Sequence, residues 1–189
     1  MAEPDRAQET HLVQLAQNGD EEAFGALYDQ HAQAVFRFLA GNLGNSQEAE
    51  DLTTEVFLRI WKALPDYESS GTPFSAFIFR IARNMLIDRY RADGRRQPVV
   101  SIDDIGLEEV LADPEQKIPD PQEYQTLHTA LQSVRSDYRE VLVLRFLNDF
   151  SIEEIAELMQ RSPGAIRVLQ HRALAAVRKV LVLNKEKQV

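Results

Sequence analysis

The sequence predicts an all-α protein of two small helical domains joined by a flexible acidic linker. Apolar residues recur at spacings of three and four along most of the chain, which is the period of a helix that buries one face. Between residues 92 and 123 this period fails, and nine acidic residues outnumber three basic ones among four prolines. Such a segment cannot bury enough apolar surface to offset its ordering entropy. The predicted domains are therefore residues 10–91 and 124–183, with the linker at residues 92–123.

The composition predicts a soluble protein of the cytoplasm. The chain has 189 residues, 44% of them hydrophobic, and it contains no run of about 18 apolar residues that could insert into a membrane. Its first residues lack the basic start and apolar stretch of a secretory signal. It has no cysteine for a disulfide in an oxidising compartment.

Four helices are expected in the first domain. One near residues 11–17 stops at Asn18-Gly19, and Asp20 caps the second, which ends at residues 41–44. The third is capped by Ser46, and Thr72-Pro73 opens the fourth. The residues expected to face inward on the second helix are Phe24, Leu27, Tyr28, Val35, Phe36 and Leu39; on the third, Leu52, Val56, Ile60 and Leu64; on the fourth, Phe74, Phe77, Ile78, Ile81, Met85 and Leu86.

The second domain carries a helix-turn-helix pattern. Two helices come first, with apolar stripes at Leu127, Leu131 and Val134 and then at Tyr138, Val141 and Leu142. Ser151 and Glu154 form a capping box ahead of a short helix at about residues 152–159. Ser162-Pro163 starts the last helix, with Ile166, Leu169, Ala173 and Val177 facing inward.

The charge distribution permits DNA binding although the net charge is -9. Residues 77–96 hold six arginines against two acids, and residues 161–187 hold seven basic residues against one acid. Phosphate contacts need such basic islands. Solvated helix surface is the competing interpretation for either island alone, and the charges by themselves leave both open.

The last helix can read duplex DNA if its predicted inner face is buried. In a helix-turn-helix the first helix braces a second one that lies in the major groove. Arg167, Gln170, His171 and Arg178 then point outward, with Arg172 at the margin, and can reach base edges and phosphates. An ordinary helical hairpin with a polar face is the alternative.

The second domain resembles region 4 of the extracytoplasmic-function sigma factors. The resemblance rests on Arg139-Glu140-Val141-Leu142-Val143-Leu144-Arg145, on Ser151-Ile152-Glu153-Glu154-Ile155-Ala156 and on Gly164-Ala165-Ile166-Arg167. In that family the module binds the minus-35 promoter element and the flap of the polymerase beta subunit. The resemblance therefore implies that Arg167, Gln170, His171 and Arg172 contact the minus-35 element.

The first domain resembles regions 2.2 to 2.4 of the same family. Ala49-Glu50-Asp51-Leu52-Thr53-Thr54-Glu55-Val56-Phe57 and Trp61 are similar to the helix that docks on the clamp helices of the beta-prime subunit, although Thr54 replaces the usual glutamine. Asp51 and Glu55 lie one turn apart, and with Glu48 and neighbouring Leu58 they form an acidic, partly apolar face that suits a basic helix. Taken alone, such a stripe is more often a solvated surface. The resemblance implies that the clamp-binding residues are Asp51, Glu55, Leu58 and Trp61.

The next helix resembles the part of the family that melts the minus-10 element and captures an unstacked base. The matching residues run from Pro73 to Asn84 and on to Asp88-Arg89-Tyr90. Asn84 matches a pocket position, and an amide can both donate to and accept from a base edge. The arginines can hold phosphates and Tyr90 can stack on a base, although core packing is the alternative for Tyr90 and the preferred role of Phe74 and Phe77. The implied minus-10 contacts are Arg80, Arg83, Asn84, Arg89 and Tyr90.

The resemblance thus implies a sigma factor that binds core RNA polymerase and promoter DNA and needs no cofactor. The acidic linker would run past the polymerase active site toward the RNA exit path. An anti-sigma factor is a further family expectation, motivated only by the exposed clamp-binding face.

Three other classes of function are alternatives to this interpretation. An enzyme finds little support, because there is no phosphate loop and the four histidines are too scattered for a metal site. A free-standing helix-turn-helix regulator would bind duplex DNA unaided, whereas a sigma factor needs polymerase. A helical adaptor that binds only protein would leave both basic islands as solvated surface.

Overall fold

The computed structural model describes residues 6–68, 73–92 and 121–186, and these residues form helices without any strand. The chain divides into two compact units, which are described separately below. The predicted linker falls almost entirely outside the described residues, as does Thr72, the predicted opening residue of the fourth helix.

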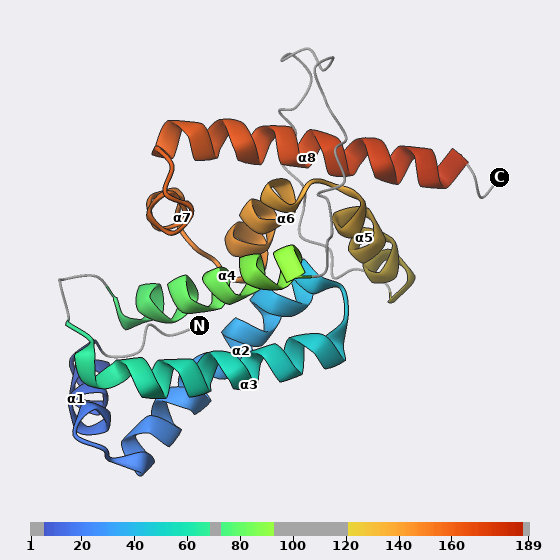
Figure 1. The fold of residues 1–189 in the computed structure, drawn as a ribbon. Coiled ribbons are helices and arrows are strands. Elements are labelled where there is room, and N and C mark those ends of the chain that lie inside the picture. Colours follow the sequence, from blue (N-terminus) through green and yellow to red (C-terminus); the bar gives the residue numbers. More distant parts are fainter. Residues whose placement is uncertain (1–5, 69–72, 93–120, 187–189) are drawn as a thin grey trace. The chain divides into compact units, whose positions relative to one another are not determined.

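The first unit contains α1 (Arg6–Gln17), α2 (Glu21–Leu43), α3 (Ser46–Ala63), the short 3-10 turn η1 (Leu64–Asp66) and α4 (Phe74–Ala92). Figure 1 labels α1 to α4 on the ribbon. Apolar side chains from all of these elements make the core of the unit. Phe24 of α2 meets Phe57 of α3, and Phe38 of α2 meets Phe79 of α4. The four inward residues predicted on α3 and η1 are all buried, as the helical period requires.

Two polar contacts attach α1 to this core. The amide of Gln17 donates hydrogen bonds to the carbonyl oxygens of Leu64 and Tyr67 at 3.1 and 2.7 Å, which joins the end of α1 to the turn after α3. A buried contact of 2.9 Å joins Glu9 Oε1 to Nε2 of His31 on α2. Buried polar groups need such partners, so these contacts also fix where α1 lies.

The N-cap of α3 differs from the prediction, because Asn45 and not Ser46 caps the helix. Asn45 has extended backbone angles, and its side-chain oxygen accepts a hydrogen bond from the Glu48 amide at 3.2 Å. Ser46 is already the first helical residue. Asparagine and serine are both good caps, so the sequence alone placed the start one residue late.

This difference gives a stability prediction. We expect Asn45→Ala to lower the free energy of unfolding of the first unit by about 1 kcal/mol, because a cap side chain is lost. Ser46→Ala is the matched control and should change it little. The single tryptophan, Trp61, lies on α3, so its fluorescence during urea unfolding reports this unit. A larger loss in the serine variant would contradict the assigned cap.

The buried face of α4 is also rotated from the prediction. Its buried residues are Phe74, Ile78, Phe79, Ala82 and Leu86, whereas Phe77, Ile81 and Met85 are only half-buried. The reason is that α4 packs on both α2 and α3, so its buried face extends to Phe79 on the side of α2. On α2, Phe38 is buried and the predicted core residue Tyr28 is 39% exposed.

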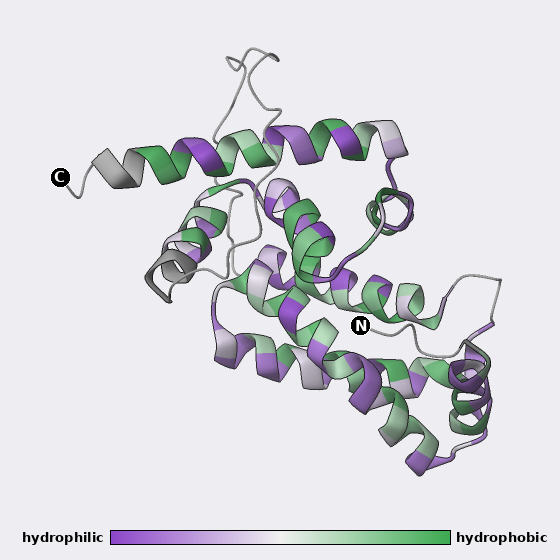
Figure 2. Ribbon diagram, turned by 180° about the vertical axis from the view of Figure 1, so that it is seen from behind, coloured by the Kyte–Doolittle hydropathy of each residue, from purple (hydrophilic) through white to green (hydrophobic). Residues whose placement is uncertain are grey.

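The second unit contains α5 (Pro121–Ser133), α6 (Ser136–Leu142), the π-helical turn η2 (Val143–Leu147), α7 (Ile152–Met159) and α8 (Pro163–Glu186). Helix α5 begins within the segment predicted as linker, and the predicted stripe residue Leu127 is 39% exposed. The long helix α8 packs against α5, α6 and α7. Hydrophobic and hydrophilic residues alternate along its ribbon in Figure 2, as expected of a helix with one buried face.

The helix-turn-helix has the predicted bounds and caps. Ser151 and Glu154 form the capping box of α7, and α7 spans Ile152–Met159. Gln160 ends that helix in the left-handed conformation, with φ of 55°, and the Ala165 amide donates to the Ser162 hydroxyl at the start of α8. Ile166, Leu169, Ala173 and Val177 are buried, which confirms the predicted inner face.

Candidate functional site

The outward face of α4 collects four of the five residues predicted to contact the minus-10 element. Arg80 and Asn84 are exposed and lie one turn apart, and Arg83 and Tyr90 are half-exposed and lie seven residues apart. At about 100° per residue these pairs form two adjacent stripes on one side of the helix. The Arg80 guanidinium lies 5.9 Å from the centre of the Phe77 ring, which holds its stem along the helix. This side therefore offers an amide, two guanidinium groups and one aromatic ring to a partner.

Arg89 does not share that face. It follows Arg80 by nine residues, which is about two and a half turns, so it lies on the opposite side of α4. Its Nε atom contacts Oε1 of Glu48 on α3 at 2.7 Å. The Glu48 side chain is only 15% exposed and that of Arg89 is 49% exposed. Arg89 therefore ties α4 to α3.

Asp88 is paired within its own helix. Its Oδ1 atom accepts a hydrogen bond from Nη1 of Arg91 at 3.2 Å, and both side chains are more than half exposed. This contact links Asp88 to the last turn of α4. A surface pair of this kind adds little stability.

Asp51 and Glu55 of α3 line an acidic groove between α3 and α4. Both carboxylates are exposed, and the groove has a volume of about 660 Å³. Its lining includes four acidic side chains and two arginines, namely Glu48, Asp51, Glu55, Asp88, Arg59 and Arg89. Such a surface attracts a cationic partner and repels the phosphates of DNA.

Leu58 and Trp61 line a second, aromatic groove on the other side of α3, between α2 and α3. It has a volume of about 320 Å³. The rings of Phe24 and Trp61 lie 4.7 Å apart in it, and those of Tyr28 and Phe57 also lie 4.7 Å apart. Leu58 is 56% exposed at its edge. Thr54, which replaces the family's glutamine, also lines this groove.

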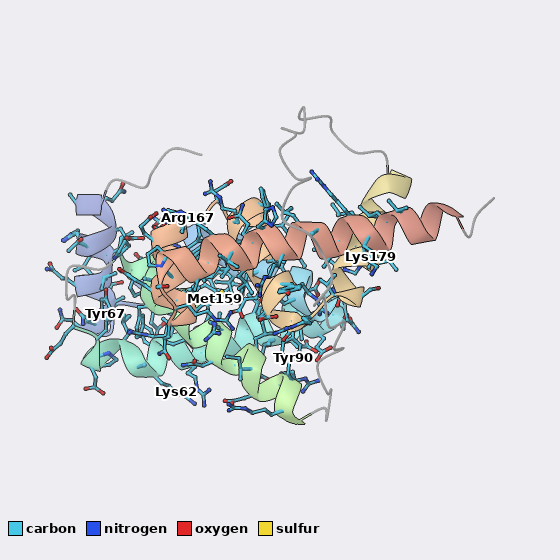
Figure 3. All side chains as sticks on the ribbon, turned by 90° about the horizontal axis from the view of Figure 1, so that it is seen from above. Lys62, Tyr67, Tyr90, Met159, Arg167 and Lys179 are labelled. Carbon is cyan, nitrogen blue, oxygen red and sulfur yellow. The ribbon has the colours of Figure 1, made fainter. Side chains whose placement is uncertain are left out.

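The predicted clamp-binding residues thus fall on one exposed surface of α3 with two chemical characters. Asp51, Glu55, Leu58 and exposed Lys62 follow one another at helical spacing along its crest, with the acidic groove on one side and the aromatic groove on the other. Lys62 is labelled in Figure 3. Charged groups set the orientation of a partner helix, and exposed apolar groups provide the area that it buries.

The start of α8 presents the residues predicted to contact the minus-35 element. Arg167 and Arg172 are exposed, whereas Gln170 and His171 are half-buried. An Nη2 atom of Arg167 contacts Oε1 of Glu153 on α7 at 3.2 Å, with the two side chains 62% and 66% exposed. Figure 3 shows Arg167 near the N-terminal end of α8 and Lys179 near its other end. An exposed pair is worth less than about 1 kcal/mol, so Arg167 can turn toward DNA at small cost.

Some residues with a place in this site were not predicted as part of it. Glu153 pairs with Arg167 on α8, whereas Glu48, which was predicted on the acidic face of α3, pairs with Arg89 on α4. No sequence signal reveals such a pairing, because the partners are 14 and 41 residues apart. Val168, 52% exposed beside Arg167, was not predicted either. The sequence did contain a signal for Val168, because this apolar residue lies outside the predicted buried stripe of α8 and was therefore expected to be exposed.

The described part of the chain contains neither a membrane-spanning helix nor a metal-binding cluster. None of its helices combines the length and hydropathy that a membrane crossing requires. Within the same residues there is no cluster of three or more histidine, aspartate or glutamate side chains arranged to hold a metal ion.

Comparison with known proteins agrees with the geometry of both units. The family model Sigma-70 region 2 matches residues 27–96, and the model Sigma-70, region 4 matches residues 124–177. The chain is 33% identical over 180 residues to the ECF RNA polymerase sigma factor BldN of Streptomyces coelicolor, covering 95% of this chain and 68% of that protein. It is 32% identical over 175 residues to the ECF RNA polymerase sigma factor ShbA of Streptomyces griseus, covering 88% and 92%.

A solved structure has the same fold. The sigma factor RpoE from Bartonella quintana, in complex with the anti-sigma factor NepR, matches with a TM-score of 0.65 and 25% identity. The match covers 84% of this chain and 96% of that one.

Proposed function

Because this chain belongs to the extracytoplasmic-function sigma factors, which act with RNA polymerase in promoter-specific transcription initiation, we propose that its two units divide that task between named surfaces. The crest of α3 docks on the polymerase clamp, the outward face of α4 binds the minus-10 element, and the start of α8 binds the minus-35 element. The observation that carries this division is the separation of charge in the first unit. Acidic side chains gather on α3, whereas the outward face of α4 carries arginines.

The proposed clamp contact uses both grooves beside α3. A basic helix of the beta-prime subunit would place its cations against Asp51 and Glu55 and its apolar stripe against Leu58 and Trp61. Both carboxylates are exposed, so a cationic partner can reach them directly. Electrostatic attraction would steer the encounter, and the aromatic groove would provide buried area.

The proposed melting step uses the outward face of α4. Asn84 would hold the edge of an unstacked nontemplate base, Tyr90 would stack on a base, and Arg80 and Arg83 would hold phosphates. Unstacking a base costs a few kcal/mol. Capture of the base offsets that cost and shifts the equilibrium toward the open complex. In this proposal polymerase catalyses RNA synthesis, and this chain contributes promoter recognition and strand separation.

Arg89 takes a different role in this proposal from that of Arg80 and Arg83. Its contact with Glu48 lies on the side of α4 that faces α3, where the groove is acidic. We therefore assign Arg89 first to holding α4 on α3. A phosphate contact by Arg89 would require the guanidinium to exchange Glu48 for DNA. Equal losses of open complex in Arg80→Ala and Arg89→Ala, with unchanged unfolding, would count against this assignment.

The upstream contact gives a direct prediction. Arg167→Ala should lower holoenzyme binding to a promoter with an intact minus-35 element by about tenfold to a hundredfold, the value of one bidentate base contact. Because the side chain is exposed, the fold should be unaffected. Quantitative footprinting with reconstituted holoenzyme measures the effect. Lys179→Ala, farther along α8, is the matched control.

The same measurement distinguishes the other function classes. On a promoter whose upstream element has been scrambled, Arg167→Ala and wild type should bind alike. If the chain were an adaptor that binds only protein, Arg167→Ala would not change promoter binding on either the intact or the scrambled promoter. A free-standing regulator would bind the duplex tightly without polymerase, and that result would refute the proposed division of tasks.

The solved relative that is bound to an anti-sigma factor supports a further proposal. The aromatic groove and exposed Leu58 form a surface that an inhibitor would cover before polymerase does. We expect a stoichiometric inhibitor to co-purify from native lysate, and repeated failure to recover one would count against this proposal.

The proposed site of action is the cytoplasm. Cell fractionation tests this, because the protein should be recovered in the same fraction as RNA polymerase.

A further inference from the structure

We propose that Val168 is a specificity-determining residue, and that its methyl groups recognise the C5-methyl group of a thymine in the major groove of the upstream promoter element. This inference rests on the proposed function of α8 as the recognition helix. It goes beyond that function by assigning one kind of base to one side chain, and that side chain is neither charged nor polar.

The exposure of Val168 is the first observation. Its side chain lies on α8 with 52% exposure, next to exposed Arg167 and buried Leu169. Single exposed apolar residues are common on proteins and need no explanation by themselves. The position of Val168 gives it significance, because the first turns of a recognition helix are the part that contacts base edges.

The neighbours of Val168 place it on the surface that would enter the groove. Gly164 and Arg172 are four residues before and after it, so the three side-chain positions follow one another along one exposed stripe of α8. Arg167 is adjacent and lies near the N-terminal end of the helix in Figure 3. An apolar side chain is thus set between two exposed arginines, which would hold it against DNA through phosphate or guanine contacts.

Gly164 is an independent observation in favour of a close partner. It has no left-handed backbone angle, and a Cβ atom at this position would meet nothing within 4 Å. Neither backbone conformation nor packing within the chain therefore requires glycine at this second residue of α8. The missing side chain leaves room for a base edge or the sugar-phosphate backbone to approach α8 one turn from Val168.

The chemistry then selects the base. In the major groove, thymine presents a methyl group, whereas guanine, adenine and unmethylated cytosine present only polar atoms beside ring carbons. A valine can bury its methyl groups against that methyl group, and it would leave the polar atoms of another base without partners. The gain from one buried methyl group is about fourfold in affinity, corresponding to ~0.8 kcal/mol.

The test removes the methyl group from each side of the contact in turn. Promoters are first selected from a randomised library with holoenzyme reconstituted from core RNA polymerase and the full chain. Each thymine of the selected upstream element is then replaced by deoxyuridine, which lacks only the methyl group. With wild type, one replacement should weaken binding about fourfold. With Val168→Ala the same replacement should have no effect, because the partner methyl groups are already gone.

A matched control is available on the same helix. Val182 is 56% exposed near the other end of α8, and Val182→Ala should keep the full deoxyuridine effect. The proposal is overturned if no thymine of the element shows the effect, or if Val168→Ala retains it. Failure of the underlying function is a different result, since the holoenzyme would then select no upstream element at all, or Arg167→Ala would leave its use of that element intact.

Discussion

Asp51→Arg is expected to lower the affinity of the chain for core RNA polymerase by about a hundredfold or more. The substitution places a cation in a groove where four acidic side chains face two arginines, and where the proposed partner helix is itself basic. Like charges brought together in an interface cost several kcal/mol, and each 1.4 kcal/mol is a factor of ten in affinity. Titration of labelled protein with core polymerase measures the loss, and run-off transcription should fall in parallel.

The control for Asp51→Arg is the same charge change elsewhere on the first unit. Asp29 is an exposed aspartate on α2 that lines neither of the two grooves beside α3. Asp29→Arg should bind polymerase like wild type apart from a small effect of net charge. If both variants lose affinity equally, general electrostatic attraction accounts for the loss and the assigned docking surface is wrong. Circular dichroism of both variants confirms that the helices are intact.

Asn84→Ala is expected to give the second large effect, a loss of open complexes of about tenfold to a hundredfold with polymerase binding unchanged. The side chain is exposed on α4, so its removal leaves no cavity and no buried partner without a hydrogen bond. The variant loses the amide that would hold a captured base, and a good bidentate contact is worth about 1 to 3 kcal/mol. Permanganate reactivity of unpaired thymines near the start site measures the open complex.

A promoter template that is already unpaired distinguishes a role of Asn84 in melting from a role in duplex binding. On a promoter with mismatched strands across the minus-10 element, unpairing has already occurred, so the deficit of Asn84→Ala should become smaller. Lys179→Ala, on α8 of the second unit, is the control and should form open complexes like wild type on both templates. A deficit of equal size on matched and mismatched templates would assign Asn84 to duplex binding and exclude a role in melting.

The fold class and most helix positions were predictable because they depend on short-range order. The capping box at Ser151 and Glu154 fixed the start of α7, and the apolar period fixed the buried face at the start of α8. Errors arose where two local signals were equally good, as with Asn45 and Ser46 at the start of α3. The N-cap is the residue whose backbone angles are extended just before the helix begins. These angles depend on the preceding turn, and the identity of the cap residue alone does not determine them.

The composition of the candidate surfaces was less predictable. The basic island of α4 suggested a single arginine face, yet Arg89 is on the side of α3 and contacts Glu48. The buried face of α4 includes Phe79, which the apolar stripe from Phe74 to Leu86 did not include. Both differences follow from the packing of α4 on two helices, which rotates its buried face away from the predicted stripe.

The sequence by itself determined which segments are helical, where most of them begin, and which family the motifs resemble, since helical period and caps act within a few residues. Only the tertiary structure decided that Asp51 and Glu55 border an acidic groove while Trp61 lies in an aromatic one. It also decided that Glu48 forms an ion pair with Arg89 and that Glu153 forms one with Arg167. These pairings join different helices, and which side chains meet there depends on how the helices pack against each other.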